Sequence, residues 1–169
     1  MRESCPRCDH ERMNTQGPPA LTTAMPQQHP SPETQSRPSN RLPTTSISST
    51  IAEILSEMQK NEQNADIQKE SCVALWSLAD NNDNDRVAIA AGGITMILSA
   101  MRTHSSNADV QEYGCAALWN LAYNENNKVT IAEAGGIALI LSTMDNHSSN
   151  DNLQYYSCAS IWKLAANNA

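Results

Sequence analysis

The N-terminal end of the chain carries one cluster of residues that could hold a metal ion. Cys5 and Cys8 form a Cys-x-x-Cys pair, and His10 follows. A structural zinc site needs four such ligands, and the remaining cysteines lie in a different part of the chain. A thiol redox centre would need a strand and a helix around the pair, and the sequence of this segment predicts neither. We therefore expect no metal site and no redox centre here.

Three further cysteines recur at an interval of 43 residues. Cys72, Cys115 and Cys158 lie in the phrases SCVALWSLA, GCAALWNLA and SCASIWKLA. Such a set could form a disulfide or bind a metal. Neighbouring helices lie about 8–10 Å apart, however, whereas a disulfide needs Cα atoms within about 7 Å. We therefore expect three buried cysteines that act as small apolar side chains.

Two histidines recur at the same interval, His104 in HSSNADVQ and His147 in HSSNDNLQ. We expect both at the C-terminal ends of helices, where the helix dipole favours a cation, and not in a metal site. The sequence contains no hydrolase elbow, phosphate loop, zinc-protease helix or dinucleotide fingerprint. It therefore predicts no enzyme activity, no catalytic residue and no cofactor.

The interval predicts a repeated group of helices. The phrase AGGITMILSAM at 91–101 returns as AGGIALILSTM at 134–144. Within each copy the apolar residues fall at i, i+3, i+4 and i+7, which is one stripe of an α-helix. Each unit reads as a short helix, a Gly-Gly turn, a second helix, a loop and a third helix. We expect the turn glycines to be left-handed.

An asparagine precedes each expected third helix at an equivalent position. These residues are Asn64, Asn107 and Asn150, and the central helix is expected to run from near Asn107 to about Ala122. Asparagine accepts hydrogen bonds from the first free backbone N–H groups of a helix. We therefore predict that the three asparagines are N-caps.

The phrases NKVTIAEAGGIALIL and VQEYGCAALWNLA resemble the armadillo repeat. The resemblance covers a repeat domain at 47–169, with repeats at about 48–90, 91–133 and 134–169. It implies an all-α fold, namely an α-solenoid in which about three three-helix repeats form a right-handed superhelix. In this family the third helices line a concave groove that binds extended peptides of partner proteins.

Residues 1–46 differ in composition from the repeats. All eight prolines lie there, between Pro6 and Pro43, whereas all three tryptophans lie in the repeats. A segment rich in Pro, Gln, Ser and Thr cannot bury enough apolar surface to fold, so we expect a disordered tail. Its start resembles no secretory signal, and no apolar run reaches the roughly 18 residues of a membrane span. We expect a cytoplasmic or nuclear protein without membrane insertion.

A helical wheel of the central third helix separates a core side from a second face, which the resemblance makes the groove. There Asn120 would hydrogen-bond a peptide backbone, although its equivalents are Ser77 and Lys163. Two compatible interpretations of the tryptophans are open: they pack between successive third helices, and they contact a bound peptide. The expected groove residues share this face and are Asn120, Trp119, Ala116, Tyr113, Tyr123, Trp76, Ser77, Trp162 and Lys163.

Charge is divided unevenly along the chain, with a net charge of +1 over 1–45 and −8 over 46–169. An acidic body argues against nucleic-acid binding, which needs a basic surface. It favours a protein partner that is neutral or basic.

The spacing of the units predicts the length of peptide that the groove would bind. With units about 8–10 Å apart, three units would bind roughly six to nine residues of extended peptide.

These observations support three functional hypotheses. The leading one is a non-catalytic scaffold or adaptor that binds an extended peptide of a partner protein. The alternative is an assembly module, or a piece of a longer array, that pairs through its uncapped C-terminal end and self-associates there. In the third, the tail with Ser31-Pro32 is the recognised part and the repeats localise it.

Overall fold

The computed structural model describes the backbone of residues 44–166 and the side chains of residues 48–166. Within this range the chain forms eight helices and no strand, so the all-α prediction is confirmed. The disordered tail predicted for 1–46 lies outside the described residues as far as residue 43, whereas its last three residues, 44–46, form the start of the first helix and differ from the prediction. The helices are α1 (Thr44–Lys60), α2 (Ala65–Ala79), α3 (Asp83–Ala90), α4 (Gly93–Thr103), α5 (Ala108–Leu121), α6 (Glu125–Glu133), α7 (Gly136–Asn146) and α8 (Asp151–Ala165).

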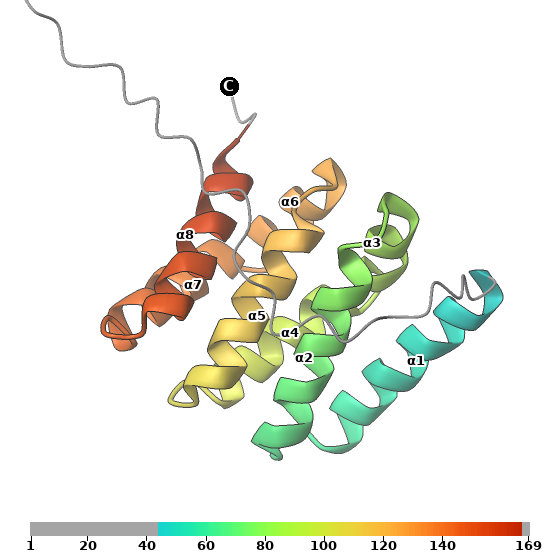
Figure 1. Cartoon of the computed structure of the whole chain (residues 1–169), viewed down its shortest axis with the longest axis horizontal. Coiled ribbons are helices and arrows are strands. Elements are labelled where there is room, and N and C mark those ends of the chain that lie inside the picture. The colour runs from blue at the N-terminus through green and yellow to red at the C-terminus, as the bar shows by residue number, and fades with distance from the viewer. Residues whose placement is uncertain (1–43, 167–169) are drawn as a thin grey trace, which may run out of the picture. The chain divides into compact units, whose positions relative to one another are not determined.

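The helices of this body lie in three rows (Figure 1). The helices α2, α5 and α8 lie side by side with α5 in the middle, and α1 packs on α2, α4 on α5 and α7 on α8. The short helices α3 and α6 contact each other. We call α1–α2, α3–α5 and α6–α8 units 1, 2 and 3, and we call α2, α5 and α8 the third helices. The right-handed superhelix of armadillo repeats stays a prediction.

Asparagine begins each third helix, as predicted. The Asn107 side chain accepts a hydrogen bond from the backbone N–H of Val110 at 3.1 Å. Asn64 and Asn150 cap α2 and α8 in the same way. Because these bonds satisfy N–H groups that have no partner inside the helix, they fix where each third helix starts.

The two Gly-Gly turns differ, and the prediction of left-handed glycines is correct only for one. Gly135 has φ +78°, whereas Gly92 has φ 171°, which is extended backbone. The helix before Gly92 has eight residues and the helix before Gly135 has nine. With one residue fewer, the chain closes the first turn through a hydrogen bond from the Gly92 N–H to the Ala90 carbonyl at 2.7 Å.

A glutamine in the first turns of every third helix ties that helix to the one before it. The buried Gln111 donates through Nε2 to the carbonyl oxygens of Met101 at 2.7 Å and His104 at 3.0 Å. Gln68 and Gln154 make the same pair of bonds in units 1 and 3. The end of the second helix and the start of the third are therefore held together identically in all three units.

Replacing this glutamine with a side chain of similar size removes the bonds and keeps the volume. We expect Gln111→Leu to lower the free energy of unfolding by about 1–3 kcal/mol, because two buried carbonyl groups lose their partner. Urea denaturation measures the loss. The exposed Gln63 provides the control, and Gln63→Leu should change stability by less than about 0.5 kcal/mol. Equal losses in the two variants would contradict the role of Gln111.

Candidate functional site

The third helices and the residues just after them bring four of the nine predicted groove residues, Trp76, Tyr113, Trp119 and Tyr123, into one aromatic cluster. The Tyr156 ring of α8 lies 5.9 Å from Trp76 of α2 and 6.2 Å from Trp119 of α5, between ring centroids. Trp76 also lies 6.2 Å from Tyr113. These separations are typical of aromatic pairs that contribute about 0.5–1.5 kcal/mol each beyond their burial. We call the side of the third helices that carries these rings the third-helix face.

Two members of the cluster, Tyr155 and Tyr156, were not among the predicted groove residues. Tyr155 lies 6.5 Å from Trp119 and 5.3 Å from Tyr156. The sequence held a signal for the second, because Tyr156 follows Tyr113 by 43 residues. Burial, and to a lesser degree the charge of Glu112, raises the pKa of Tyr156, so its hydroxyl stays protonated near neutral pH.

Trp76 and Trp119 pack between successive third helices, as one of the two interpretations of the tryptophans predicts. Trp76 and Trp119 are half-buried by the ring contacts of the cluster, whereas Trp162 is exposed. Ser77, on the same face of α2, is also exposed. The face therefore has a packed aromatic centre and leaves one tryptophan open to solvent beside it.

Two predicted groove residues lie beneath this face. Ala116 has 0% and Asn120 has 4% of its surface exposed. The helical wheel treated α5 alone, but α2 and α8 flank it, and Trp76 meets Tyr156 across it. Asn120 donates through Nδ2 to the Trp76 carbonyl at 3.1 Å and so joins units 1 and 2. Contact of Ala116 and Asn120 with a peptide stays a prediction.

The indole N–H of Trp119 is buried and has no hydrogen-bond partner among the described residues. Buried donors are nearly always bonded in native proteins, and leaving one without a partner costs about 1–3 kcal/mol. The donor belongs to the central third helix and to the middle of the aromatic cluster. It is therefore an unsatisfied donor inside the aromatic cluster.

Basic side chains gather around Tyr123, which is exposed at the C-terminal end of α5. The Lys163 Nζ lies 3.8 Å from the centre of its ring, and the Arg86 guanidinium carbon lies 5.4 Å from it. Desolvation, followed by the charge of Lys128, lowers the pKa of Lys163, and Arg86 adds to this. Two cationic side chains therefore lie over the ring of Tyr123 at this end of the third-helix face.

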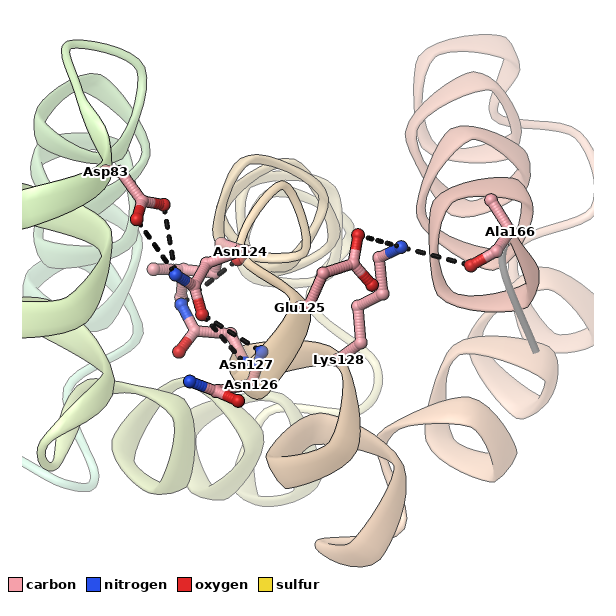
Figure 2. Close-up of polar contacts among 8 residues, drawn as sticks. Asp83, Asn124, Glu125, Asn126, Asn127, Lys128 and Ala166 are labelled. Carbon is pink, nitrogen blue, oxygen red and sulfur yellow. Dashed lines mark hydrogen bonds and ion pairs between the residues drawn. The ribbon is translucent and has the colours of Figure 1, made fainter.

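Polar contacts at the start of α6 link it to α3 of unit 2 and to the end of α8 in its own unit (Figure 2). The Asn124 Nδ2 donates to both carboxylate oxygens of Asp83, at 3.0 and 3.1 Å. The Lys128 Nζ forms an ion pair with Glu125 at 2.9 Å and donates to the Ala166 carbonyl at 3.0 Å. These contacts hold the start of α6 against α3 on one side and against the end of α8 on the other.

The recurring histidines lie at the ends of the second helices, as predicted, and also link the units. The Nε2 of His104 lies 2.8 Å from the Glu62 carbonyl oxygen, and that of His147 lies 2.8 Å from the Ser105 carbonyl oxygen. Each contact requires a proton on Nε2. The same bond therefore forms at both junctions between units, which the sequence did not reveal.

The recurring cysteines divide into two kinds. Cys72 and Cys115 are buried, as predicted, and burial raises the pKa of each to about 12. The prediction is wrong for Cys158, which is exposed. The helix α5 covers the Cys72 side of α2 and α8 covers the Cys115 side of α5, but no described helix follows α8.

No family model matches this chain, and neither a curated protein nor a solved structure matches it. The likeness to the armadillo repeat therefore depends on the repeated phrases alone. None of the described helices is long and apolar enough to cross a membrane.

The three repeat cysteines should react differently with a thiol reagent. In a chain carrying Cys5→Ser and Cys8→Ser, we expect one fast-reacting thiol at about pH 8, that of Cys158, because a thiol with a raised pKa supplies almost no thiolate. The absorbance after addition of Ellman's reagent gives the number of reactive thiols, and the other two thiols should react once denaturant unfolds the chain. Fast reaction of more than one thiol in the folded chain would contradict this assignment.

Removing the Asn120 side chain should cost stability. Asn120→Ala leaves the Trp76 carbonyl without its donor, so we expect the free energy of unfolding to fall by about 1–3 kcal/mol. Ser77 occupies the equivalent position in unit 1 and is exposed, so Ser77→Ala is the matched control and should be nearly neutral. If denaturation gives the same free energy of unfolding for both variants, Asn120 has no role in joining units 1 and 2.

Proposed function

We propose that this chain is a non-catalytic protein-interaction module that binds an extended segment of a partner protein on its third-helix face. The observation that carries the proposal is the aromatic cluster across α2, α5 and α8, with the unpartnered indole N–H of Trp119 at its centre. Rings offer flat apolar surface, and one donor among them offers a place for a backbone carbonyl.

This chemistry suits an extended peptide with loose sequence requirements. An extended chain presents a carbonyl group at every residue, so one of them can reach the Trp119 donor in most registers. Its side chains would lie on the rings of Trp76, Trp119 and Trp162, which accept many apolar shapes. We give the role of main-chain donor to Trp119, and we give Asn120 the role of holding the third helices together.

Charge favours a neutral or basic partner, and nucleic acid is not part of the proposal. The body carries a net charge of −8, which attracts basic segments over a distance. On the face itself the charges are mixed, with Glu70 and Glu112 on α2 and α5 and with Lys163 and Arg86 around Tyr123. An acidic group within a basic peptide would therefore lie best at the Tyr123 end.

The arrangement we infer for the body is the superhelix of armadillo-type repeats, in a protein of the cytoplasm or the nucleus. The rows of helices, the glutamine bonds in each unit and the histidine bonds between units all recur at intervals of 42 or 43 residues. A repeated junction places each new unit on the previous one by the same operation, which is how a superhelix arises.

The proposal is tested with arrays of extended peptides about nine residues long, in basic, neutral and acidic series. We expect basic and neutral peptides to bind, and fluorescence anisotropy gives their dissociation constants. Trp119→Ala should weaken binding by about tenfold or more, because it removes both a ring and the donor. Trp119→Phe keeps a ring and loses the donor, so it should bind with an intermediate affinity.

The matched control is Val129→Ala, at an exposed position of α6, which is not one of the third helices. It should leave the affinity unchanged, and circular dichroism melts should show that each variant is folded. Failure of every peptide series to bind the wild-type chain would overturn the proposal. So would equal affinities for wild type and a folded Trp119→Ala variant.

A further inference from the structure

The third-helix face carries equivalent aromatic rings at the spacing of neighbouring helices. Trp76 of α2 and Trp119 of α5 occupy the same position in successive units, and α2 packs directly on α5. Both rings contact Tyr156, at 5.9 Å from Trp76 and 6.2 Å from Trp119 between centroids. Helices in contact lie about 8–10 Å apart. The face therefore repeats its largest apolar side chain at about that interval.

The same face is poor in groups that can pair with the N–H groups of a bound peptide. A carboxamide both accepts and donates, and the only one among the nine predicted groove residues is that of Asn120. Asn120 is 4% exposed and donates to the Trp76 carbonyl. The Trp119 indole offers a donor and no acceptor. Apart from hydroxyl groups such as that of Ser77, a peptide with an N–H at every residue would find few acceptors here, and burying unpaired N–H groups is costly.

A polyproline II helix fits both features of this face. Proline has no backbone N–H and so brings no donor that needs a partner. The helix rises about 3.1 Å per residue with three residues per turn, which puts prolines at i and i+3 about 9 Å apart. That distance agrees with the spacing of neighbouring third helices. Side chains on one face of a β-strand recur about every 6.5 Å, which agrees less well.

We propose that the third-helix face binds a proline-rich segment of a partner protein in the polyproline II conformation, with a proline at every third position. One proline lies against Trp76 and the next lies against Trp119. The carbonyl groups of such a helix make no internal hydrogen bonds, and one of them accepts from the Trp119 Nε1, which has no partner among the described residues. This inference rests on the proposed function and names the class of segment bound.

The conformation of the segment also favours binding. A polyproline II helix is largely formed before it binds, so it loses less conformational freedom than a flexible peptide. The residues between the prolines lie on its other sides, because each turn contains three residues. These positions are free to carry basic side chains, which the net charge of −8 over 46–169 attracts.

The tail of this chain is itself rich in proline but lacks the required spacing. Eight prolines lie between Pro6 and Pro43, and no two of them are three residues apart. The nearest approach is Pro26, Pro32 and Pro38, at intervals of six residues. These would leave one of two adjacent third helices without a proline. We therefore assign the segment to another protein.

Three peptides of nine residues test the spacing on the full chain. The first contains three copies of Pro-Ala-Arg. The second has the same composition with its prolines at positions one, three and eight, so that no two are three apart, and the third has alanine in place of every proline. We expect fluorescence anisotropy to give the first peptide an affinity at least about fivefold higher than that of the other two, because it alone supplies prolines to two adjacent rings in a preformed helix.

Variants of the full chain locate the binding site. Trp76→Ala should reduce the advantage of the first peptide over the second to less than about twofold, because only one of the two rings remains. Val129→Ala, at an exposed position of α6, should keep the full advantage. Circular dichroism melts show whether each variant is folded. If Trp76→Ala does not fold, the comparison of the three peptides on the wild-type chain decides alone.

Two results on the wild-type chain would overturn the inference and leave the proposed function standing. These are equal affinities for the first and second peptides, and tighter binding of the proline-free peptide. If none of the three peptides binds, the inference fails, and the proposed function fails with it only if the basic, neutral and acidic arrays also show no binding.

A further variant identifies the source of the segment. The full chain with Pro26→Ala, Pro32→Ala and Pro38→Ala should bind the first peptide with unchanged affinity. Tighter binding by this variant would show that the tail of this chain competes for the face, which would overturn the assignment to a partner protein.

Discussion

The arrangement of the described helices depends on one buried interaction, the two hydrogen bonds from a glutamine amide to the end of the second helix. Gln111 bonds the last carbonyl groups of α4 and its following turn, and Gln68 and Gln154 repeat this in the other units. A helix end leaves carbonyl groups that need donors. The amide supplies them and fixes the angle of the third helix, so three third helices can lie side by side and carry one face.

The aromatic cluster is a consequence of that stacking. Trp76 and Tyr156 come from the first and last units, yet their rings lie 5.9 Å apart, and Tyr113 and Trp119 of the helix between them each lie 6.2 Å from one of these two rings. The Trp119 donor is buried within this cluster. A ligand for this face would compete with ring packing, which favours extended segments that can insert apolar side chains and a carbonyl group together.

Local features of this fold could be predicted from the sequence, and features that depend on neighbours could not. The asparagine caps and the 43-residue unit follow from residue type and spacing, which act within one helix. The burial of Ala116 and Asn120 depends on helices far along the chain, which a wheel of α5 does not contain. Cys115 is covered by α8, whereas no described helix covers Cys158, and Gly92 differs from Gly135 because α3 is one residue shorter than α6.

The polar bonds at the two junctions are unequal, and this shapes how the body opens. Units 2 and 3 share bonds from Thr143, Ser160 and Asn124, whereas units 1 and 2 are joined by those of Asn120 and His104. In a stack whose units touch only their neighbours, stability passes along the chain through such junctions. Fewer side-chain hydrogen bonds hold unit 1 to unit 2 than hold unit 3 to unit 2, so these bonds oppose the separation of unit 1 less strongly.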